Sequence, residues 1–100
     1  MNTEIINIIR SVVRRYVDDA EIFLFGSRAR GDFRDTSDWD VLVIVKDAAG
    51  RDLSNAIDYE LWNEGLDHGE QINTIVRTRS QWKNNVSLFK KHVIAEGIRL

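Results

Sequence analysis

The chain opens with apolar and polar positions that alternate at the period of an α-helix. Apolar side chains recur three and four positions apart, at Ile5, Ile8, Ile9, Val12, Val13 and Tyr16. This spacing places them on one face of a helix and predicts an amphipathic segment that ends before Asp18 and Asp19. Two later stretches repeat the helical pattern, one marked by Leu53, Ile57 and Leu61 that ends near Gly65, the other by Leu88, Phe89, Val93 and Ile94 that stops at Gly97. A shorter helical turn containing Trp82 is expected in between, with Ser80 as its cap.

Three apolar segments have the length and composition of β-strands. Residues 21–25 (EIFLF) are rich in β-forming side chains and end at a glycine. Residues 40–45 (DVLVIV) are apolar on both faces, which predicts a central strand covered on both sides. Residues 71–76 (QINTIV) alternate in character and predict a third strand. Strands that alternate with helices indicate one α/β (α+β) domain over residues 1–100, with a small mixed sheet flanked by helices.

Composition removes several classes of function. The chain has 100 residues, a net charge of −2 and no cysteine, which excludes disulfides, thiolate zinc sites and cysteine nucleophiles. The charge gives no overall attraction for DNA, so we expect no direct DNA binding. No apolar run approaches the roughly 18 residues of a membrane span, and Glu4 stands where a signal peptide carries basic residues. We therefore expect a cytoplasmic protein without a membrane partner.

The Gly26–Ser27 pair follows the strand expected at residues 21–25 and precedes a polar segment. Backbone N–H groups at such a glycine turn suit phosphate oxygens, because glycine lets a ligand approach the backbone closely. Ser27 adds a hydroxyl group to the same place. Taken alone, the pair is a weak signal and is more typical of an ordinary helix N-cap.

Asp38 and Asp40 precede the central strand at a spacing of two residues. On a strand this spacing places both carboxylates on one face, where their charges repel unless a cation lies between them. Mg²⁺ is commonly held by one or two carboxylates together with substrate phosphates. A solvated, aspartate-rich turn is the alternative explanation. Trp39 points the other way and is expected in the core.

The combination is more specific than its parts. Gly26–Ser27, ten further residues, the Asp38–Trp39–Asp40 triplet and an apolar strand occur in that order. This order resembles the signature of the DNA polymerase β-type nucleotidyltransferase superfamily, and "GSRARGD…SDWDVLV" is similar to its minimal nucleotidyltransferase branch, which includes antitoxin-type proteins. The final "LFKKHVIAEGIRL" also resembles the closing helix of bacterial members.

The resemblance implies an activity and a set of site residues. Gly26 and Ser27 would hold the triphosphate of ATP or another nucleotide. Arg28 and Arg30 are further nucleotide-binding candidates, with pairing to an acidic residue as the alternative. Asp38 and Asp40 would be the catalytic and metal-binding residues, with Mg²⁺, or alternatively Mn²⁺, beside the α-phosphate. A hydroxyl acceptor would receive the nucleoside monophosphate, AMP in the first instance. By analogy with the family, the acceptor would be a tyrosine of a helical HEPN-type toxin, which would be the protein partner. The alternative is that the chain has no such partner and forms a homo-oligomer.

One position departs from the pattern of active members. Enzymes of the superfamily commonly carry a third carboxylate on a later strand, and the position that aligns with it here is Asn73. An amide is not a base near neutral pH. Glu70 lies on the opposite face of the strand and is a poor substitute. The sequence thus leaves two possibilities, a nucleotidyltransferase with a reduced site or a catalytically impaired antitoxin module that neutralises its partner by contact.

The remaining polar residues receive structural roles. Asp32 and Asp35 are expected in the loop as arginine partners, and His68 and His92 at the surface.

Overall fold

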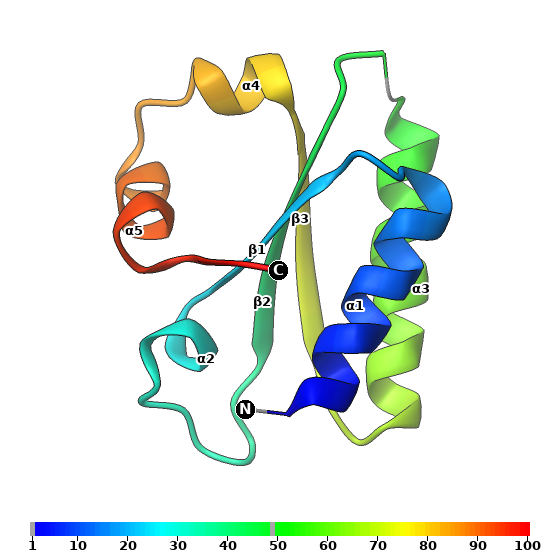
Figure 1. Ribbon diagram of the computed structural model, residues 1–100, viewed down its shortest axis with the longest axis vertical. Coiled ribbons are helices and arrows are strands. Elements are labelled where there is room, and N and C mark those ends of the chain that lie inside the picture. Colours follow the sequence, from blue (N-terminus) through cyan, green and yellow to red (C-terminus); the bar gives the residue numbers. More distant parts are fainter. Residues whose placement is uncertain (1, 49) are drawn as a thin grey trace.

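The computed structural model describes residues 2–48 and 50–100, and within them a four-stranded sheet with helices on both faces (Figure 1). The elements are α1 (Thr3–Tyr16), β1 (Glu21–Phe25), α2 (Ser27–Arg30), β2 (Trp39–Val45), α3 (Arg51–Asp67), β3 (Ile72–Thr78), α4 (Arg79–Lys83), α5 (Leu88–Glu96) and β4 (Ile98–Arg99). The strand order is β3-β2-β1-β4. β2 runs antiparallel to β1 and parallel to β3, so the sheet is mixed, as predicted.

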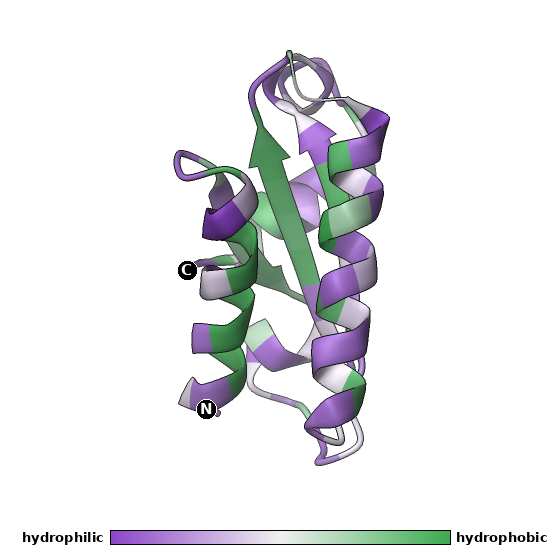
Figure 2. Cartoon of the chain, turned by 90° about the vertical axis from the view of Figure 1, so that its right-hand side faces the viewer, coloured by the Kyte–Doolittle hydropathy of each residue, from purple (hydrophilic) through white to green (hydrophobic). Residues whose placement is uncertain are grey.

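Helices α1 and α3 form one layer over the sheet, and α4 and α5 lie on the other side (Figure 1). Figure 2 looks onto the α1–α3 layer and shows hydrophobic strands between and behind two helices whose outer surfaces are largely hydrophilic. The parallel pair β2 and β3 is joined through α3, because parallel neighbours need a crossover connection. The fold class inferred from the sequence is confirmed.

Strand β2 is buried on both faces, which confirms its predicted central position. Val41, Val43 and Val45 pack into the larger apolar cluster with α1 and α3. Leu42 and Ile44 belong to a second cluster on the opposite face, which includes Val93 and the partly buried Phe25, Ile75, Trp82 and Phe89. Alternate residues of this strand therefore serve two cores.

Several boundaries differ from the sequence-based expectation. Helix α3 continues to Asp67, beyond the expected end near Gly65. The N-cap of α4 is Thr78, whose hydroxyl accepts from the Gln81 N–H at 3.1 Å, whereas Ser80 lies inside the helix and donates its N–H to Asp47. The prediction of Ser80 as the cap is therefore wrong.

The chain after α5 also departs from expectation. Its last residues form β4, which pairs with β1 and was not predicted. The apolar stripe expected along α5 is only partly buried, since Val93 is in the core while Leu88 and Ile94 are exposed. No helix among the described residues is long and apolar enough to span a membrane.

Candidate functional site

Three segments bring the predicted site residues together at one end of the sheet. Phe25, the last residue of β1, pairs with Asp40, and Asp40 pairs in turn with Asn73 on β3. Gly26 follows Phe25 directly, and Asp38 precedes β2 by one residue. Asp40 shares its strand face with Leu42 and Ile44, so the site lies on the face of the sheet away from α1 and α3.

Gly26 packs directly against the Asp40 carboxylate. A Cβ atom built on Gly26 would lie 2.4 Å from the Asp40 Oδ2 atom, far inside van der Waals contact. The residue also has φ 74° and ψ −158°, a conformation that is essentially restricted to glycine. Gly26 is the N-cap of α2 without a side-chain capping bond, and Ser27 is the first helical residue. The pair therefore does form the N-cap of α2, as the alternative expected, but the cap is Gly26 and the Ser27 hydroxyl makes no capping bond.

Asn73 joins the two carboxylates. Its Nδ2 atom donates to Asp38 Oδ2 at 3.0 Å and lies 3.5 Å from Asp40 Oδ1. The structure thus places Asn73 beside both aspartates, as the strand alignment predicted. The amide N–H group occupies the space between two acids, where it offsets part of their mutual repulsion.

The pKa of Asp40 is raised above the ordinary value of an aspartate. Burial raises the pKa of Asp40, and the nearby charge of Asp38 raises it further. The hydrogen bond from Asn73 and the charge of Arg30 lower the pKa of Asp40 and partly compensate. The folded chain therefore holds a carboxylate whose charge is disfavoured unless a cation approaches it.

The donor set fits one hard divalent cation. Two carboxylates and an amide, which presents an oxygen when its side chain is rotated, match the oxygen ligands that Mg²⁺ takes when substrate phosphates complete the shell. No group of three or more His, Asp or Glu side chains able to hold a metal occurs among residues 2–48 and 50–100. The site thus offers two carboxylates for a metal, because Asn73 occupies the position where active members of the superfamily carry a third.

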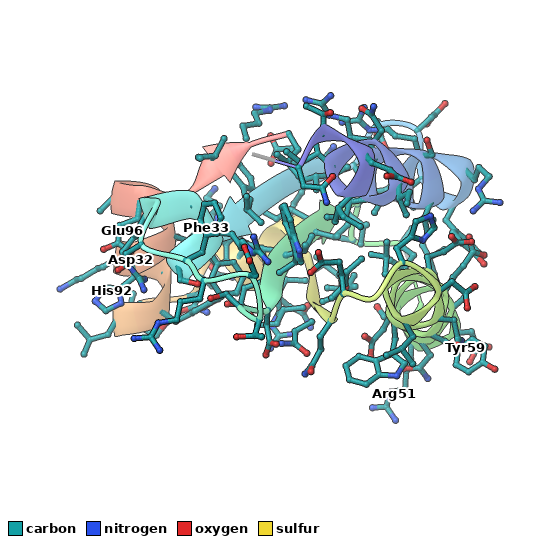
Figure 3. All side chains as sticks on the ribbon, turned by 90° about the horizontal axis from the view of Figure 1, so that it is seen from below. Asp32, Phe33, Arg51, Tyr59, His92 and Glu96 are labelled. Atoms are coloured by element: carbon teal, nitrogen blue, oxygen red, sulfur yellow. The ribbon has the colours of Figure 1, made fainter. Side chains whose placement is uncertain are left out.

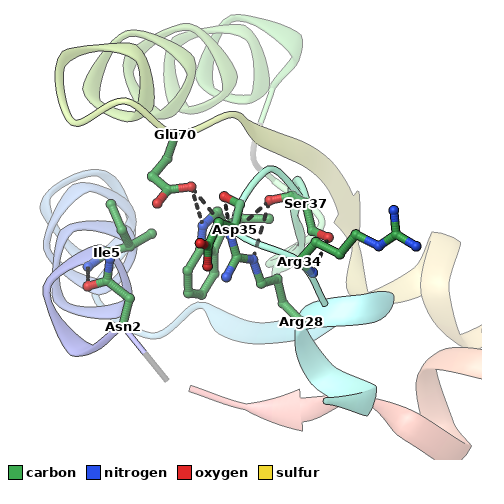
Figure 4. A network of polar contacts seen from close by, with 8 residues as sticks. Asn2, Ile5, Arg28, Arg34, Asp35, Ser37 and Glu70 are labelled. Atoms are coloured by element: carbon green, nitrogen blue, oxygen red, sulfur yellow. Dashed lines mark hydrogen bonds and ion pairs between the residues drawn. The ribbon is translucent and has the colours of Figure 1, made fainter. Parts of the chain in front are cut away.

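Of the two kinds of partner expected for Arg28, the structure shows the acidic one, Glu70. Its side chain is 5 % exposed, and its guanidinium lies between the rings of Phe33 and Trp39, at 4.5 Å from each centroid. It donates to the backbone oxygen of Ser37 and lies 3.5 Å from the Glu70 carboxylate (Figure 4). With these partners the Arg28 side chain is not available to a nucleotide.

Arg30 remains accessible at the edge of the site. Its Nε atom donates to Asp32 at 3.3 Å and its NH1 atom to Glu96 at 3.4 Å, and its side chain is 43 % exposed. Asp32 and Glu96 are labelled at the same edge in Figure 3. The pairing of Asp32 with an arginine confirms its predicted role, whereas Asp35 meets Arg28 only through its backbone oxygen.

Trp39 and Glu70 form a layer behind the aspartates. Trp39 is fully buried, as predicted, and its indole N–H donates to Glu70 Oε2 at 3.1 Å. The sequence excluded Glu70 from the site but did not reveal that it holds Trp39 and Arg28. Arg28 and Trp39 lie eleven positions apart, and this spacing does not predict that the two side chains are in contact. Both His68 and His92 are exposed, as predicted.

Comparisons with known proteins agree with this geometry. Residues 5–100 match the family described as the nucleotidyltransferase domain. Among solved structures, a proposed nucleotidyltransferase is 25 % identical with a TM-score of 0.68, and the match covers 95 % of this chain and 96 % of the other. A proposed minimal nucleotidyltransferase is 24 % identical with a TM-score of 0.67, over 100 % of this chain and 97 % of the other.

A third structure contains a partner. The complex of tri-AMPylated Shewanella oneidensis HEPN toxin with MNT antitoxin has a chain that is 18 % identical, with a TM-score of 0.67, over 99 % of this chain and 71 % of that one. The curated proteins contain no match. Because the family match spans nearly the whole sequence, the chain belongs to the nucleotidyltransferase domain family, with the fold seen in minimal nucleotidyltransferases and in the complex of an MNT antitoxin.

Proposed function

We propose that this chain transfers a nucleoside monophosphate, AMP from ATP in the first instance, to a hydroxyl acceptor. The observation that carries the proposal is the contact of the Gly26 backbone with the Asp40 carboxylate, with a Cβ-to-Oδ2 approach of 2.4 Å. It puts a glycine turn suited to phosphate next to a carboxylate suited to a divalent cation. A triphosphate bound at the turn would lie within reach of both groups.

Each residue receives a role in this proposal. Gly26 and Ser27 bind the triphosphate through the turn and the Ser27 hydroxyl. Asp38 and Asp40 hold Mg²⁺, or alternatively Mn²⁺, and the metal when bound neutralises charge on the transferring phosphate. Arg30 and its partner Asp32 are both exposed at the edge of the site, so Arg30 can exchange Asp32 for a phosphate oxygen. The acceptor oxygen forms a bond to the α-phosphorus, and the bond to pyrophosphate breaks.

The acceptor is proposed to be a hydroxyl-bearing side chain of a protein partner. The fold is shared with a chain from a complex whose HEPN toxin is AMPylated, which supports a HEPN-type toxin as the partner. A tyrosine as the modified residue is what the family resemblance implies. Asn73 cannot take the proton of the acceptor, since an amide is not a base near neutral pH. Proton removal therefore depends on solvent or on the partner, and we expect slow transfer.

Label transfer tests the proposal. The chain is incubated with Mg²⁺, a HEPN-type partner and ATP labelled at the α-phosphate, and label is sought on the partner. Wild type should transfer label, whereas Asp38→Ala/Asp40→Ala should not. ATP labelled at the γ-phosphate separates nucleotidyl transfer, which leaves the partner unlabelled, from phosphoryl transfer. An unlabelled partner under every condition would exclude the enzymatic function.

A second function is favoured by one observation. The Asn73 amide bridges the carboxylates where active members carry a third acid. This supports a catalytically impaired, nucleotide-binding antitoxin that neutralises its partner by contact. In that case Asp38→Ala/Asp40→Ala would still neutralise the partner, and no label would be transferred by wild type.

A further inference from the structure

Asp38 and Asp40 are held in place by different means. Asp40 lies within β2 and is fixed on both sides by ladder pairing with Phe25 and Asn73. Asp38 precedes the strand, at the end of the loop that follows α2. Apart from the hydrogen bond that Asn73 donates to it at 3.0 Å, the position of the Asp38 carboxylate therefore depends on what holds this loop.

The loop is held by Arg28. Its NH2 atom donates to the Ser37 carbonyl at 3.0 Å and to the Asp35 carbonyl at 3.4 Å, and its Nε atom lies 3.3 Å from the same Ser37 oxygen. The Ser37 carbonyl belongs to the peptide group that leads into Asp38, so a fork of two N–H groups restrains the carbonyl oxygen of that peptide. A planar guanidinium can make such a fork, whereas an ammonium group cannot.

The surroundings fix the guanidinium itself. It lies between the rings of Phe33 and Trp39, and it faces Glu70 Oε2 at 3.5 Å. The Glu70 oxygen also accepts from the Trp39 indole N–H, so one carboxylate holds both the arginine and the residue that follows Asp38 (Figure 4). The side chain of Arg28 is buried, which keeps water from competing for these bonds.

We propose that Arg28 is a positioning residue that sets the Asp38 carboxylate for the metal and couples it to the neighbouring Gly26–Ser27 turn. This inference rests on the proposed function of the site. Arg28 follows Ser27 directly in the chain, while its side chain ends at the peptide before Asp38. One residue thus joins the turn proposed for the triphosphate to the carboxylate proposed for the metal. Loss of the fork should therefore reduce the factor by which Mg²⁺ raises nucleotide affinity, while the nucleotide affinity without Mg²⁺ should change little.

Calorimetric titration with ATP, with and without Mg²⁺, tests the assignment. The measured quantity is the factor by which Mg²⁺ raises ATP affinity. Arg28→Lys should lower this factor by about tenfold, the lower end of the effect expected for residues that orient metal ligands. The affinity for ATP without Mg²⁺ should stay within about twofold of wild type, since the fork acts on a metal ligand. Arg34→Lys is the matched control, because Arg34 lies exposed in the same loop, and it should leave the factor unchanged.

Each other outcome has a distinct meaning. An equal loss of ATP affinity with and without Mg²⁺ in Arg28→Lys would overturn the assignment and favour a direct nucleotide contact. An unchanged factor in a folded Arg28→Lys would also overturn it. If Arg28→Lys does not fold, Glu70→Gln decides, because it keeps an acceptor for Trp39 but weakens the hold on Arg28, and it must lower the factor. A lack of Mg²⁺ effect in wild type and in Arg34→Lys alike would refute the proposed function instead.

Discussion

Replacement of Gly26 by alanine tests whether the turn and the Asp40 carboxylate form one site. The new Cβ atom would lie 2.4 Å from Asp40 Oδ2, whereas ordinary contact begins at 3.4 Å. The carboxylate must therefore move by about 1 Å, or the turn must open by the same amount. The backbone conformation adds a strain of about 1–3 kcal/mol, because alanine rarely adopts it.

Gly31 offers a matched control for the strain alone. It has φ 89° and ψ 0°, in the left-handed region, and nothing lies within 4 Å of a Cβ built there. Gly31→Ala should cost about 1–2 kcal/mol of the free energy of unfolding, without moving any carboxylate. Gly26→Ala should lose more stability than Gly31→Ala in urea unfolding, because the clash with Asp40 adds to its backbone strain, and only Gly26→Ala should disturb the site.

The difference is measured by ATP titration in the presence of Mg²⁺ and by label transfer to the partner. Displacement of a reacting group by about 1 Å can cost about 100-fold in rate, so Gly26→Ala should lose about that much transfer. Gly31→Ala should retain most of the activity of wild type. Similar losses in the two variants would refute the reasoning, since backbone strain alone would then explain them.

Two further predictions concern the charges at the site. Asn73→Asp removes an amide that donates to Asp38 at 3.0 Å, so without metal it should unfold about 1–3 kcal/mol more easily, and added Mn²⁺ or Mg²⁺ should raise its melting temperature more than that of wild type. An equal rise in melting temperature on metal addition in both proteins would contradict the role of the Asn73 amide as a bridge between the two carboxylates. Because burial raises the pKa of Asp40 in the folded state, the stabilising contribution of this group is complete at acidic pH, below about 4, and is lost as pH rises through the raised pKa. The free energy of unfolding of metal-free wild type should thus fall relative to Asp40→Asn from pH 4 to pH 7 in urea unfolding, and parallel profiles would count against burial as the cause.

The sequence was sufficient for the parts of the fold that depend on local pattern. The run at residues 40–45 is apolar at every position after Asp40, and only a strand buried on both faces accommodates this. The strand period also placed Trp39 in the core and Asp40 on the opposite face of the strand. These inferences held because the period is determined by backbone geometry. Asn73, in contrast, was singled out by the resemblance to the superfamily, and the parallel register that pairs it with Asp40 is seen only in the structure.

Features that depend on contacts between distant segments were not accessible in the same way. β4 has only two residues, both exposed, and it exists because the chain after α5 returns to β1. Arg28 stands in a polar segment typical of a solvated surface, yet Phe33 and Trp39 enclose it. No local pattern encodes that enclosure, because it arises when the loop folds back over the arginine.

The site lies where one face of the sheet changes from core to polar surface. Along β2 this face carries Asp40, Leu42 and Ile44, and the last two are buried in the cluster beside α5. A side chain on a strand of a packed core keeps its position well, so the core beneath Leu42 also holds Asp40. Asp38 lies outside the ladder and lacks this support, so its backbone is held by the buried guanidinium of Arg28 and its carboxylate by the Asn73 amide. The two carboxylates should therefore differ in their sensitivity, with Asp40 responding to changes in the sheet and at Gly26, and Asp38 to changes in the arginine enclosure.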